Sequence, residues 1–480
     1  MQIETASDSS TSTCNSDEIR RSSEPCPVYG SMGRMTPGDI EDAVAAAMPR
    51  AVEDLKALVS IPSVAFPGHP EEEVHRAAAA VESLLRDAGL PTVRQIPVEG
   101  SFPAVYAEAP APPGAPTVLL YAHYDVQPPG DPALWDTPAF EPTEIDGAVY
   151  GRGAADDKSG IITHLAALRA FDGRFPVGVR VIIEGQEEYA GERLERFVEE
   201  NPELVRADAI IVADCGNPAV GDPAVTTSLR GMAAVTVEVR TLRDALHSGA
   251  FGGPAPDALA ALMRMLVALH DDNGDVRVPG LEKGVFDGDA GTDEEFRAGA
   301  GVLDGVSLVG SGSIADRIWG SYAITVTGLD VPTVSGAVNA IQAVARARVT
   351  IRVPAQNDPK TALSDVTAFL EAQTPWGAHV TFSDISVGSG FQAPAGGPAR
   401  AALDRAMTRA FGREPRDVGQ GGGIPLVATL QRQFPEAELL LFGAEDEAAR
   451  IHAPNERVVI EELRRVATAE ALFLQEYGVS

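Results

Sequence analysis

The sequence predicts an α/β protein with an inserted α+β segment, and three features support this prediction. Short apolar runs alternate with helical segments in the first half of the chain and again near its C-terminus, which is the pattern of a layered α/β fold. The stretch between them, residues 228–356, changes to alternating half-buried strands. With 480 residues, the chain is also longer than one hydrophobic core usually serves, so we expect more than one domain.

The composition is that of an ordinary globular protein, with 44% hydrophobic and 22% charged residues. The 38 basic and 69 acidic residues give a net charge of −31, which repels phosphate backbones and argues against a nucleic-acid partner. No stretch reaches the roughly 18 uninterrupted apolar residues of a membrane span, so we expect no membrane association. The three cysteines, Cys14, Cys26 and Cys215, make a poor disulfide framework, which is consistent with a reducing, cytoplasmic location.

The chain is expected to begin with a disordered leader over residues 1–34, because this stretch is rich in Ser, Thr and charge and has no apolar core. It also lacks the continuous apolar segment of a secretory signal. The first part of the α/β unit, residues 35–227, then opens with two predicted helices. Residues 41–61 and 71–89 place apolar side chains at i, i+3 and i+4, and the second segment ends at a glycine.

The rest of this first part alternates short β-rich runs with one helix. The predicted strands are residues 102–109, 117–126, 180–185 and 208–216, and the helix is residues 159–171. Such alternation predicts a largely buried sheet covered by helices. Each run from residue 117 onward ends on polar residues: His123 and Asp125, Glu187 and Glu188, and Asp214. Ligands of open α/β sheets bind at the carboxyl ends of strands, so we expect a site there.

The inserted segment contains a predicted strand at residues 231–242, a strongly amphipathic helix at 255–271 and a further strand at 339–354. We read residues 228–356 as one α+β domain. The remainder, residues 357–480, returns to helix and strand alternation and brings another polar cluster, "RIHAPNE". It is expected to complete the first α/β unit.

Several side chains that can bind metal fall at these strand ends and in the polar clusters. They are His123, Asp125, Asp156, Asp157, Glu187, Glu188, Asp214 and His452. Imidazole and carboxylate groups suit zinc and are acceptable to manganese or cobalt. Two cations a few ångströms apart need a bridging carboxylate and several terminal ligands, which this set can supply. In the His-x-Asp pair, the imidazole would bind and Asp125 would fix its orientation.

Each of these residues also has an ordinary structural interpretation. The Asp156–Asp157 pair precedes a predicted helix, and Asp is a good N-cap. The Glu187–Glu188 pair could be a solvated strand end, and Asp214 a turn residue. Acids that end consecutive apolar strands at one edge of a sheet are much harder to explain by accident, so the set as a whole favours a metal site.

Long stretches of the chain resemble the M20 family of metallopeptidases, in particular its dipeptidase branch. They are "YAHYDVQPPGDPALWDTPAFEPTEIDGAVYGRGAADDKSG", "IIEGQEEYAG", "LHSGAFGG" and "IHAPNE", and the similarity runs from about residue 40 to the C-terminus. The resemblance implies a zinc-exopeptidase-type three-layer catalytic domain with a mixed sheet, and an inserted lid or dimerisation domain. It also implies a cytoplasmic enzyme that hydrolyses dipeptides or short peptides with a free C-terminus, using two divalent metal ions per chain, zinc foremost.

The same resemblance implies a role for each site residue. His123, Asp156 and Asp214 would hold one metal ion. Asp156 as the bridge, Glu188 and His452 would hold the other. Glu187 would be the general base and then the general acid, and Asp125 would orient His123. The Asp156–Asp157 peptide bond would be cis.

In the insertion, the resemblance implies a homodimer through the lid, with His247 reaching the active site of the partner subunit. Asn339 and Arg352 match positions that bind the substrate's carboxylate or backbone. The alternatives are a turn or helix-start residue for His247 and a strand-end charge for Arg352. The loop "GQGGGIPL" departs from the family's Arg-Glu-Gly-Gly-Ser-Ile-Pro, although Gly422 remains as a backbone contact for the substrate. This departure leaves the specificity for the substrate's amino end open.

Three functional hypotheses follow. A dipeptidase is favoured by the loop "DPALWDTPAF" and by the lid motif "DALHSGAFGG", while the altered glycine loop weakens it. An N-acyl amino acid amidohydrolase or a carboxypeptidase of the same family is the second hypothesis. A non-catalytic binding protein on the same fold is the third, and it would be favoured by loss of a ligand or of the base.

Overall fold

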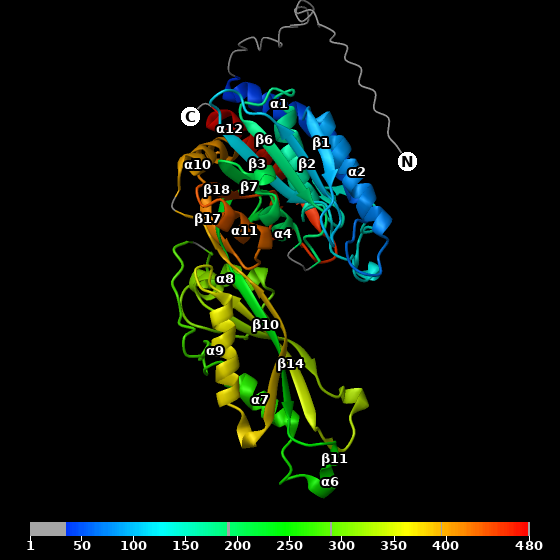
Figure 1. Ribbon diagram of the computed structural model, residues 1–480, viewed down its shortest axis with the longest axis vertical. Helices are drawn as coiled ribbons and strands as arrows, with labels where there is room; N and C mark the ends of the chain where they lie inside the picture. Colours follow the sequence, from blue (N-terminus) through cyan, green and yellow to red (C-terminus); the bar gives the residue numbers. More distant parts are fainter. Residues whose placement is uncertain (1–34, 190–192, 289, 395, 479–480) are drawn as a thin grey trace, which may run out of the picture.

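The computed structural model describes residues 35–189, 193–288, 290–394 and 396–478. The expected leader, residues 1–34, lies outside the described residues. The rest forms two units that are stacked along the long axis of the molecule (Figure 1).

The larger unit is built on a nine-stranded mixed sheet, counted over the described residues. Its order is β1 (Thr92–Ile96), β2 (Ala104–Ala109), β6 (Gly178–Glu184), β3 (Thr117–His123), β7 (Ala209–Val212), β18 (Glu438–Leu441), β9 (Ala224–Leu229) and β16 (Phe391–Gln392), with β17 (Arg416–Gln420) also paired to β9. The strands β6, β3, β7 and β18 run parallel to one another. The pairs β1–β2, β2–β6, β18–β9 and β9–β16 are antiparallel, and β17 runs parallel to β9.

Helices cover both faces of this sheet, and the sequence of β3 shows why. Val118, Leu120 and Ala122 belong to the core on one face, while Leu119 and Tyr121 belong to the core on the other. Successive strand residues point to opposite faces, so an unbroken apolar run requires two covering layers. One layer contains α1 (Pro37–Val59), α2 (Glu71–Asp87), α3 (Lys158–Arg169), α10 (Pro398–Phe411) and α12 (Ile460–Tyr477). The other contains α4 (Arg193–Glu200), α5 (Pro202–Val205) and α11 (Pro425–Gln433). The predicted three-layer α/β fold with a mixed sheet is therefore confirmed.

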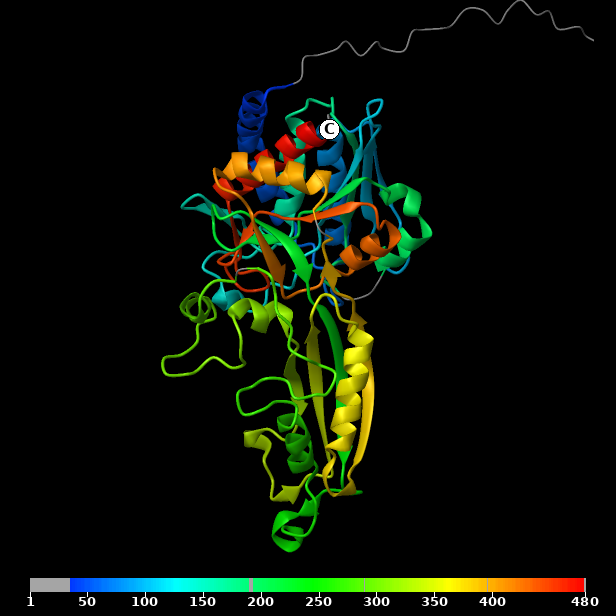
Figure 2. The same ribbon diagram turned by 90° about the vertical axis from the view of Figure 1, so that its left-hand side faces the viewer.

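The smaller unit, here called the lid, has a four-stranded antiparallel sheet and its own core. The strand order is β12 (Ala323–Asp330), β14 (Val344–Val353), β10 (Gly231–Arg240) and β15 (His379–Gly388). Helices α7 (Ala258–Val267) and α9 (Pro359–Ala372) pack on one face of it (Figure 2). Helices α6 (Ser248–Phe251) and α8 (Asp293–Gly299) complete the lid together with β11 (Leu246–His247) and β13 (Ala340–Ile341), which pair with each other.

The expected lid boundary at residue 356 is wrong, because the lid extends to the end of β15 at Gly388. Helix α9 contributes Leu363, Val366 and Leu370 to the lid core, and β15 pairs with β10. The second part of the catalytic unit therefore begins after residue 388 rather than at residue 357. The apolar periodicity of an amphipathic helix such as α9 predicts which of its faces is buried but not which sheet covers that face, so periodicity could not place this boundary.

The remaining elements are short and lie around the site or in connections. They are β4 (Thr143–Ile145), β5 (Ala148–Tyr150) and β20 (Arg457–Val459) in one small sheet, β8 (Gly216–Asn217) and β19 (Glu445–Asp446) in another, the 3-10 helices Pro132–Leu134, Val334–Gly336 and Pro375–Gly377, and a π-helical turn at Asp316–Gly320. No helix among the described residues has the length and apolar character needed to cross a membrane.

Candidate metal centre

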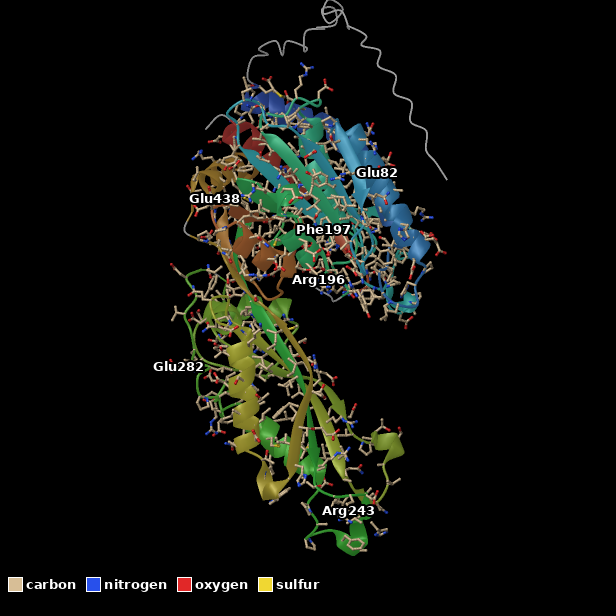
Figure 3. All side chains as sticks on the ribbon, viewed as in Figure 1. Glu82, Arg196, Phe197, Arg243, Glu282 and Glu438 are labelled. Atoms are coloured by element: carbon tan, nitrogen blue, oxygen red, sulfur yellow. The ribbon has the colours of Figure 1, made fainter. Side chains whose placement is uncertain are left out.

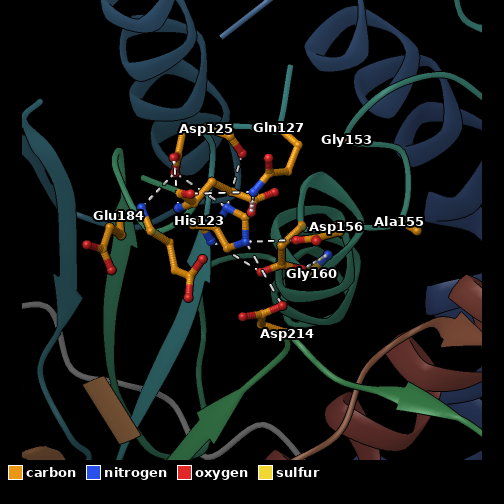
Figure 4. A network of polar contacts seen from close by, with 12 residues as sticks. His123, Asp125, Gln127, Gly153, Ala155, Asp156, Gly160, Glu184 and Asp214 are labelled. Atoms are coloured by element: carbon orange, nitrogen blue, oxygen red, sulfur yellow. Dashed lines mark hydrogen bonds and ion pairs between the residues drawn. The ribbon is translucent and has the colours of Figure 1, made fainter. Parts of the chain in front are cut away.

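A cluster of histidines and carboxylates lies where the central strands end. His123 is the last residue of β3, Glu187 and Glu188 follow the end of β6, and Asp214 follows β7 by two residues. Asp156 comes from the loop before α3. Because β3, β6 and β7 are mutually parallel, their carboxyl ends meet at one edge, which brings these side chains together. Figure 4 shows His123 facing Asp156 and Asp214.

His123 is buried and has a partner at each ring nitrogen. Its Nδ1 lies 3.1 Å from the carbonyl oxygen and 3.5 Å from the carboxylate of Asp125. Its Nε2 lies 3.0 Å from Asp156 Oδ1 and 4.0 Å from Asp214 Oδ1. Asp125 can thus hold a proton on Nδ1, and Nε2 then faces the other two carboxylates as a lone pair. This is the arrangement of a metal-ligating imidazole.

The two adjacent aspartates have different partners. Asp157 is the N-cap of α3, where its Oδ1 accepts from Gly160 N, and its Oδ2 accepts from His123 N. The carboxylate of Asp156 instead lies between His123 and His452. The expected cis peptide bond between Asp156 and Asp157 is confirmed. The helix-cap interpretation therefore describes Asp157, and Asp156 is the one directed into the cluster.

His452 and Glu188 form a second group with Asp156. His452 Nε2 lies 2.8 Å from Asp156 Oδ2 and 3.2 Å from Glu188 Oε2. Glu188 also accepts from Gln127 Nε2 at 2.7 Å. Asp156 offers one oxygen to His123 and the other to His452, so it is shared by the two groups, as a bridging ligand would be.

Asp125 links the histidine to the glutamate pair. Its carboxylate oxygens accept from Glu187 N at 3.0 Å and from Glu188 N at 3.1 Å, in addition to facing His123. Sequence reasoning assigned it only the orientation of His123. The structure adds that Asp125 holds the backbone turn from which the two glutamate side chains diverge.

Glu187 lies beside the cluster and is partly buried. Burial raises the pKa of its carboxyl to about 8, which His123 opposes and Glu188 reinforces. A carboxylate in this position can accept a proton when ionised and return it when protonated. The charge of a bound cation would lower this pKa again, so the two influences act in opposite directions.

The residues present fit divalent cations. Three sets of side chains could each surround one ion: His123, Asp157 and Asp214; Asp156, Glu188 and His452; and Asp156, Asp214 and Glu445. Burial raises the pKa of Asp214 and of Glu445 well above their ordinary values, with Asp156 adding to both shifts. Glu445 Oε1 is buried and has no hydrogen-bond partner among the described residues. Crowded, under-partnered carboxylates are what cations would neutralise.

A buried ion pair that sequence reasoning missed supports the Asp156 loop. Glu456, fully buried, accepts from Arg152 Nη1 at 2.5 Å and from the backbone N–H groups of Gly153, Ala155 and Asp156 at 2.9–3.1 Å. Its motif, "IHAPNE", also contains the predicted ligand His452. Nothing in the local pattern indicates that Glu456 contacts a loop about 300 positions earlier in the chain.

The predicted substrate-binding residues of the lid, His247, Asn339 and Arg352, do not belong to the metal-binding sets. His247 and Asn339 lie together at the far end of the lid, where Ser248 N donates to Asn339 O and β11 pairs with β13. Figure 1 shows β11 and α6 at this end, and Figure 3 places the nearby Arg243 there. His247 Nδ1 accepts from Gly249 N, so it is also the N-cap of α6, as its alternative interpretation held.

Arg352 lies at the opposite end of the lid sheet, beside the catalytic unit. It pairs in register with Met232, near the start of β10, while His247 follows the end of β10 at Arg240. Eight residues of strand span about 26 Å. His247 and Arg352 of one chain therefore lie too far apart to contact one small substrate together.

The altered glycine loop is explained by a lid side chain. A Cβ on Gly419 would lie 2.5 Å from Trp319 Cγ, so the ring occupies the space of the side chain that the family pattern has there. Trp319 also packs edge to face against Phe286, with ring centroids 4.9 Å apart. Gly422 is exposed, and a Cβ there would meet nothing within 4 Å, which leaves its backbone open to a ligand.

Comparisons with known proteins agree with this geometry. The model of "Peptidase family M20/M25/M40" matches residues 119–476. A cysteinylglycine-S-conjugate dipeptidase from Corynebacterium striatum is 40% identical over 437 residues, which cover 89% of this chain and 96% of that protein. A Cys-Gly metallodipeptidase from Saccharomyces cerevisiae is 26% identical over 402 residues, covering 79% and 82%. The crystal structure of human carnosine dipeptidase 1 superimposes with a TM-score of 0.77 at 25% identity, covering 92% of this chain and 99% of that one.

Proposed function

This chain belongs to peptidase family M20/M25/M40, and from that membership we propose that it is a metal-dependent dipeptidase acting on dipeptides or short peptides with a free C-terminus. The observation that carries the proposal is the pair of ligand groups that share Asp156, with Glu187 beside them. A binding protein on this fold would have no need to keep such a base.

Two divalent ions would be held by five side chains. His123, Asp156 and Asp214 would bind one, and Asp156, Glu188 and His452 the other, with zinc as the proposed metal because imidazole and carboxylate ligands suit it. When bound, such ions supply electrophilic polarisation of the scissile carbonyl and acidification of water. Asp125 positions His123 and the turn that carries both glutamates.

Glu187 carries the proton transfers in this proposal. As a carboxylate it accepts a proton from the attacking water, and as a carboxylic acid it returns that proton to the leaving amine. Burial of Glu187 raises its pKa and so favours the acid form needed for the return step, against the lowering effect of the bound ions. Glu188 differs in that its carboxylate is held by Gln127 and faces His452.

We propose that the enzyme works as a homodimer whose lid brings His247 to the partner's site. The separation between His247 and Arg352 within one chain supports this, since both match substrate-contacting positions. Mixing His247→Ala with Glu187→Ala protein tests it. Random exchange of subunits makes half of the dimers mixed. If His247 acts in trans, each mixed dimer has one intact site, so about a quarter of parental activity returns. No recovery in dimers shown to be mixed would contradict action in trans.

A substrate panel tests the activity itself. Purified protein with zinc or manganese is assayed on Cys-Gly, an S-substituted Cys-Gly, other dipeptides and N-acetyl amino acids. We expect hydrolysis of dipeptides and loss of activity with a chelator. Hydrolysis confined to N-acetyl amino acids would favour the amidohydrolase alternative, which the missing side chains of the glycine loop make worth testing.

A further inference from the structure

The outward face of the lid sheet carries a row of arginines. In β10 and β14 the residues at odd positions are buried in the lid core, and those at even positions point away from it. The even positions of these two strands include Arg240, Arg346, Arg348 and Arg352. Arg230 is one residue before β10, and from the same alternation we infer that it lies on the same side as Met232.

Three of these arginines have partners on their own sheet. Arg240 Nε and Arg346 Nε each donate to Glu238 at 2.6 Å. Arg348 donates to Ser386 Oγ at 3.0 Å and to the carbonyl of Asp384. In a chain with 69 acidic and 38 basic residues, such pairing is the expected condition of an arginine.

Arg230 and Arg352 differ from the other three. Among the described residues, neither guanidinium has a carboxylate within ion-pair distance or an acceptor within hydrogen-bond distance, and both side chains are only partly exposed. The Nε of Arg230 is buried without a partner. Burial lowers the pKa of Arg230 to about 10, and the like charge of Arg352 adds to this effect. Two cations that lack counter-ions are costly to keep together.

The strand register makes these two arginines neighbours. Arg352 is opposite Met232, and Arg230 is two residues before Met232 on the same face, so the pair is diagonal across the two strands. Diagonal neighbours are about 7–8 Å apart at Cα, within reach of long side chains. Both guanidinium groups can therefore contact one small anion.

The glycine loop lies beside Arg230. A Cβ on Gly421 would lie 3.4 Å from Arg230 Nη2, which shows that the guanidinium lies against the loop backbone. A Cβ on Gly422 would meet nothing within 4 Å. Arg230 thus lies against a loop whose next residue, Gly422, leaves its backbone open to a ligand.

We propose that Arg230 and Arg352 form a two-arginine carboxylate site at the junction of the two units, which selects peptides whose C-terminal residue is Asp or Glu. This inference rests on the proposed dipeptidase function. A free C-terminus supplies one carboxylate, which would neutralise one arginine. An acidic C-terminal side chain supplies a second carboxylate, which can pair bidentately with the other arginine and neutralise its charge.

The test compares isosteric substrates on the parent and on Arg230→Gln. Ala-Glu and Ala-Gln differ in one charge, so the ratio of their kcat/KM values removes effects common to both. The parent should prefer Ala-Glu by about tenfold or more, mostly through KM. In Arg230→Gln this preference should fall to near unity, and Arg230→Lys should retain part of it. Arg346→Gln, on the same face but paired with Glu238, is the matched control and should keep the parental ratio.

Two results would overturn the proposal: a parent that does not distinguish Ala-Glu from Ala-Gln, or an Arg230→Gln variant that keeps the parental ratio. Calorimetric binding of free glutamate and free glutamine separates this outcome from failure of the dipeptidase function. If no peptide is hydrolysed, the proposed function fails on its own. Tighter binding of glutamate that is lost in Arg230→Gln would still support the two-arginine site, and equal affinities would refute it.

Discussion

Replacement of Glu456 by Gln should destabilise the protein and weaken its metal binding at the same time. Glu456 is fully buried and neutralises Arg152, which is itself 1% exposed. It also accepts three backbone N–H groups of the loop that carries Asp156. Gln has the same shape but is neutral, and its amide NH₂ would face other donors.

The expected loss follows from these contacts. Leaving a buried guanidinium without its counter-ion costs about 3–5 kcal/mol, and the substitution leaves no cavity to add to this figure. Stabilities of domains are about 5–15 kcal/mol, so the variant should fold but unfold at clearly lower urea concentration. Because the loop would no longer be fixed, affinity for zinc, measured by competition with a chelator, should fall about 10–100-fold.

Glu461→Gln is the control for Glu456→Gln. Glu461 is an acid five residues away whose carboxylate is exposed and pairs with the partly exposed Arg464 and Arg465, so its loss should cost about 1 kcal/mol or less. The reasoning would be refuted if Glu456→Gln unfolded within about 1 kcal/mol of the parent and bound zinc equally well.

Two further predictions concern packing and pH. Gly419→Ala should clash with Trp319 and cost about 1–3 kcal/mol in urea unfolding, whereas Gly422→Ala, which meets open space, should change stability little; equal effects would contradict the packing account. His164 donates to Glu470 at 2.9 Å and to Tyr121 O at 3.1 Å, and although burial lowers its pKa, Glu470 raises it above the ordinary value. The stability from this pair is fully present below the unfolded pKa of about 6.5 and is lost as pH rises through the folded pKa of His164. Glu470→Gln should therefore destabilise the protein more at pH 6 than at pH 9. A loss of stability that is the same at both pH values would count against a charged His164.

Much of the architecture could be predicted from the sequence, because buried strands and helices have a recognisable pattern of apolar residues. An apolar run such as 118–122 predicts a strand covered on both faces, and the polar residues that follow it predict the edge where a site can form. Parallel pairing of β3, β6 and β7 then brings His123, the Glu187–Glu188 turn and Asp214 together. These predictions needed only local periodicity and the rule that ligands bind at carboxyl ends of strands.

What escaped prediction depends on contacts between distant segments. Glu456 reads as an ordinary acid after a turn, and only the fold brings it to Arg152. Likewise, the sequence shows only that Gly419 lacks a side chain, whereas the structure shows that Trp319 of the lid fills the space such a side chain would occupy. The lid boundary was misplaced for the same reason, because tertiary contacts decide which sheet α9 packs on.

The central claim is that Glu187 moves the proton at a metal centre built by its neighbours. Glu187→Gln removes the base but none of the five proposed ligands. With the bound metal content measured and equal to that of the parent, dipeptide turnover should fall by about 10²–10⁴-fold. Turnover within tenfold of the parent, at equal metal content, would contradict the account.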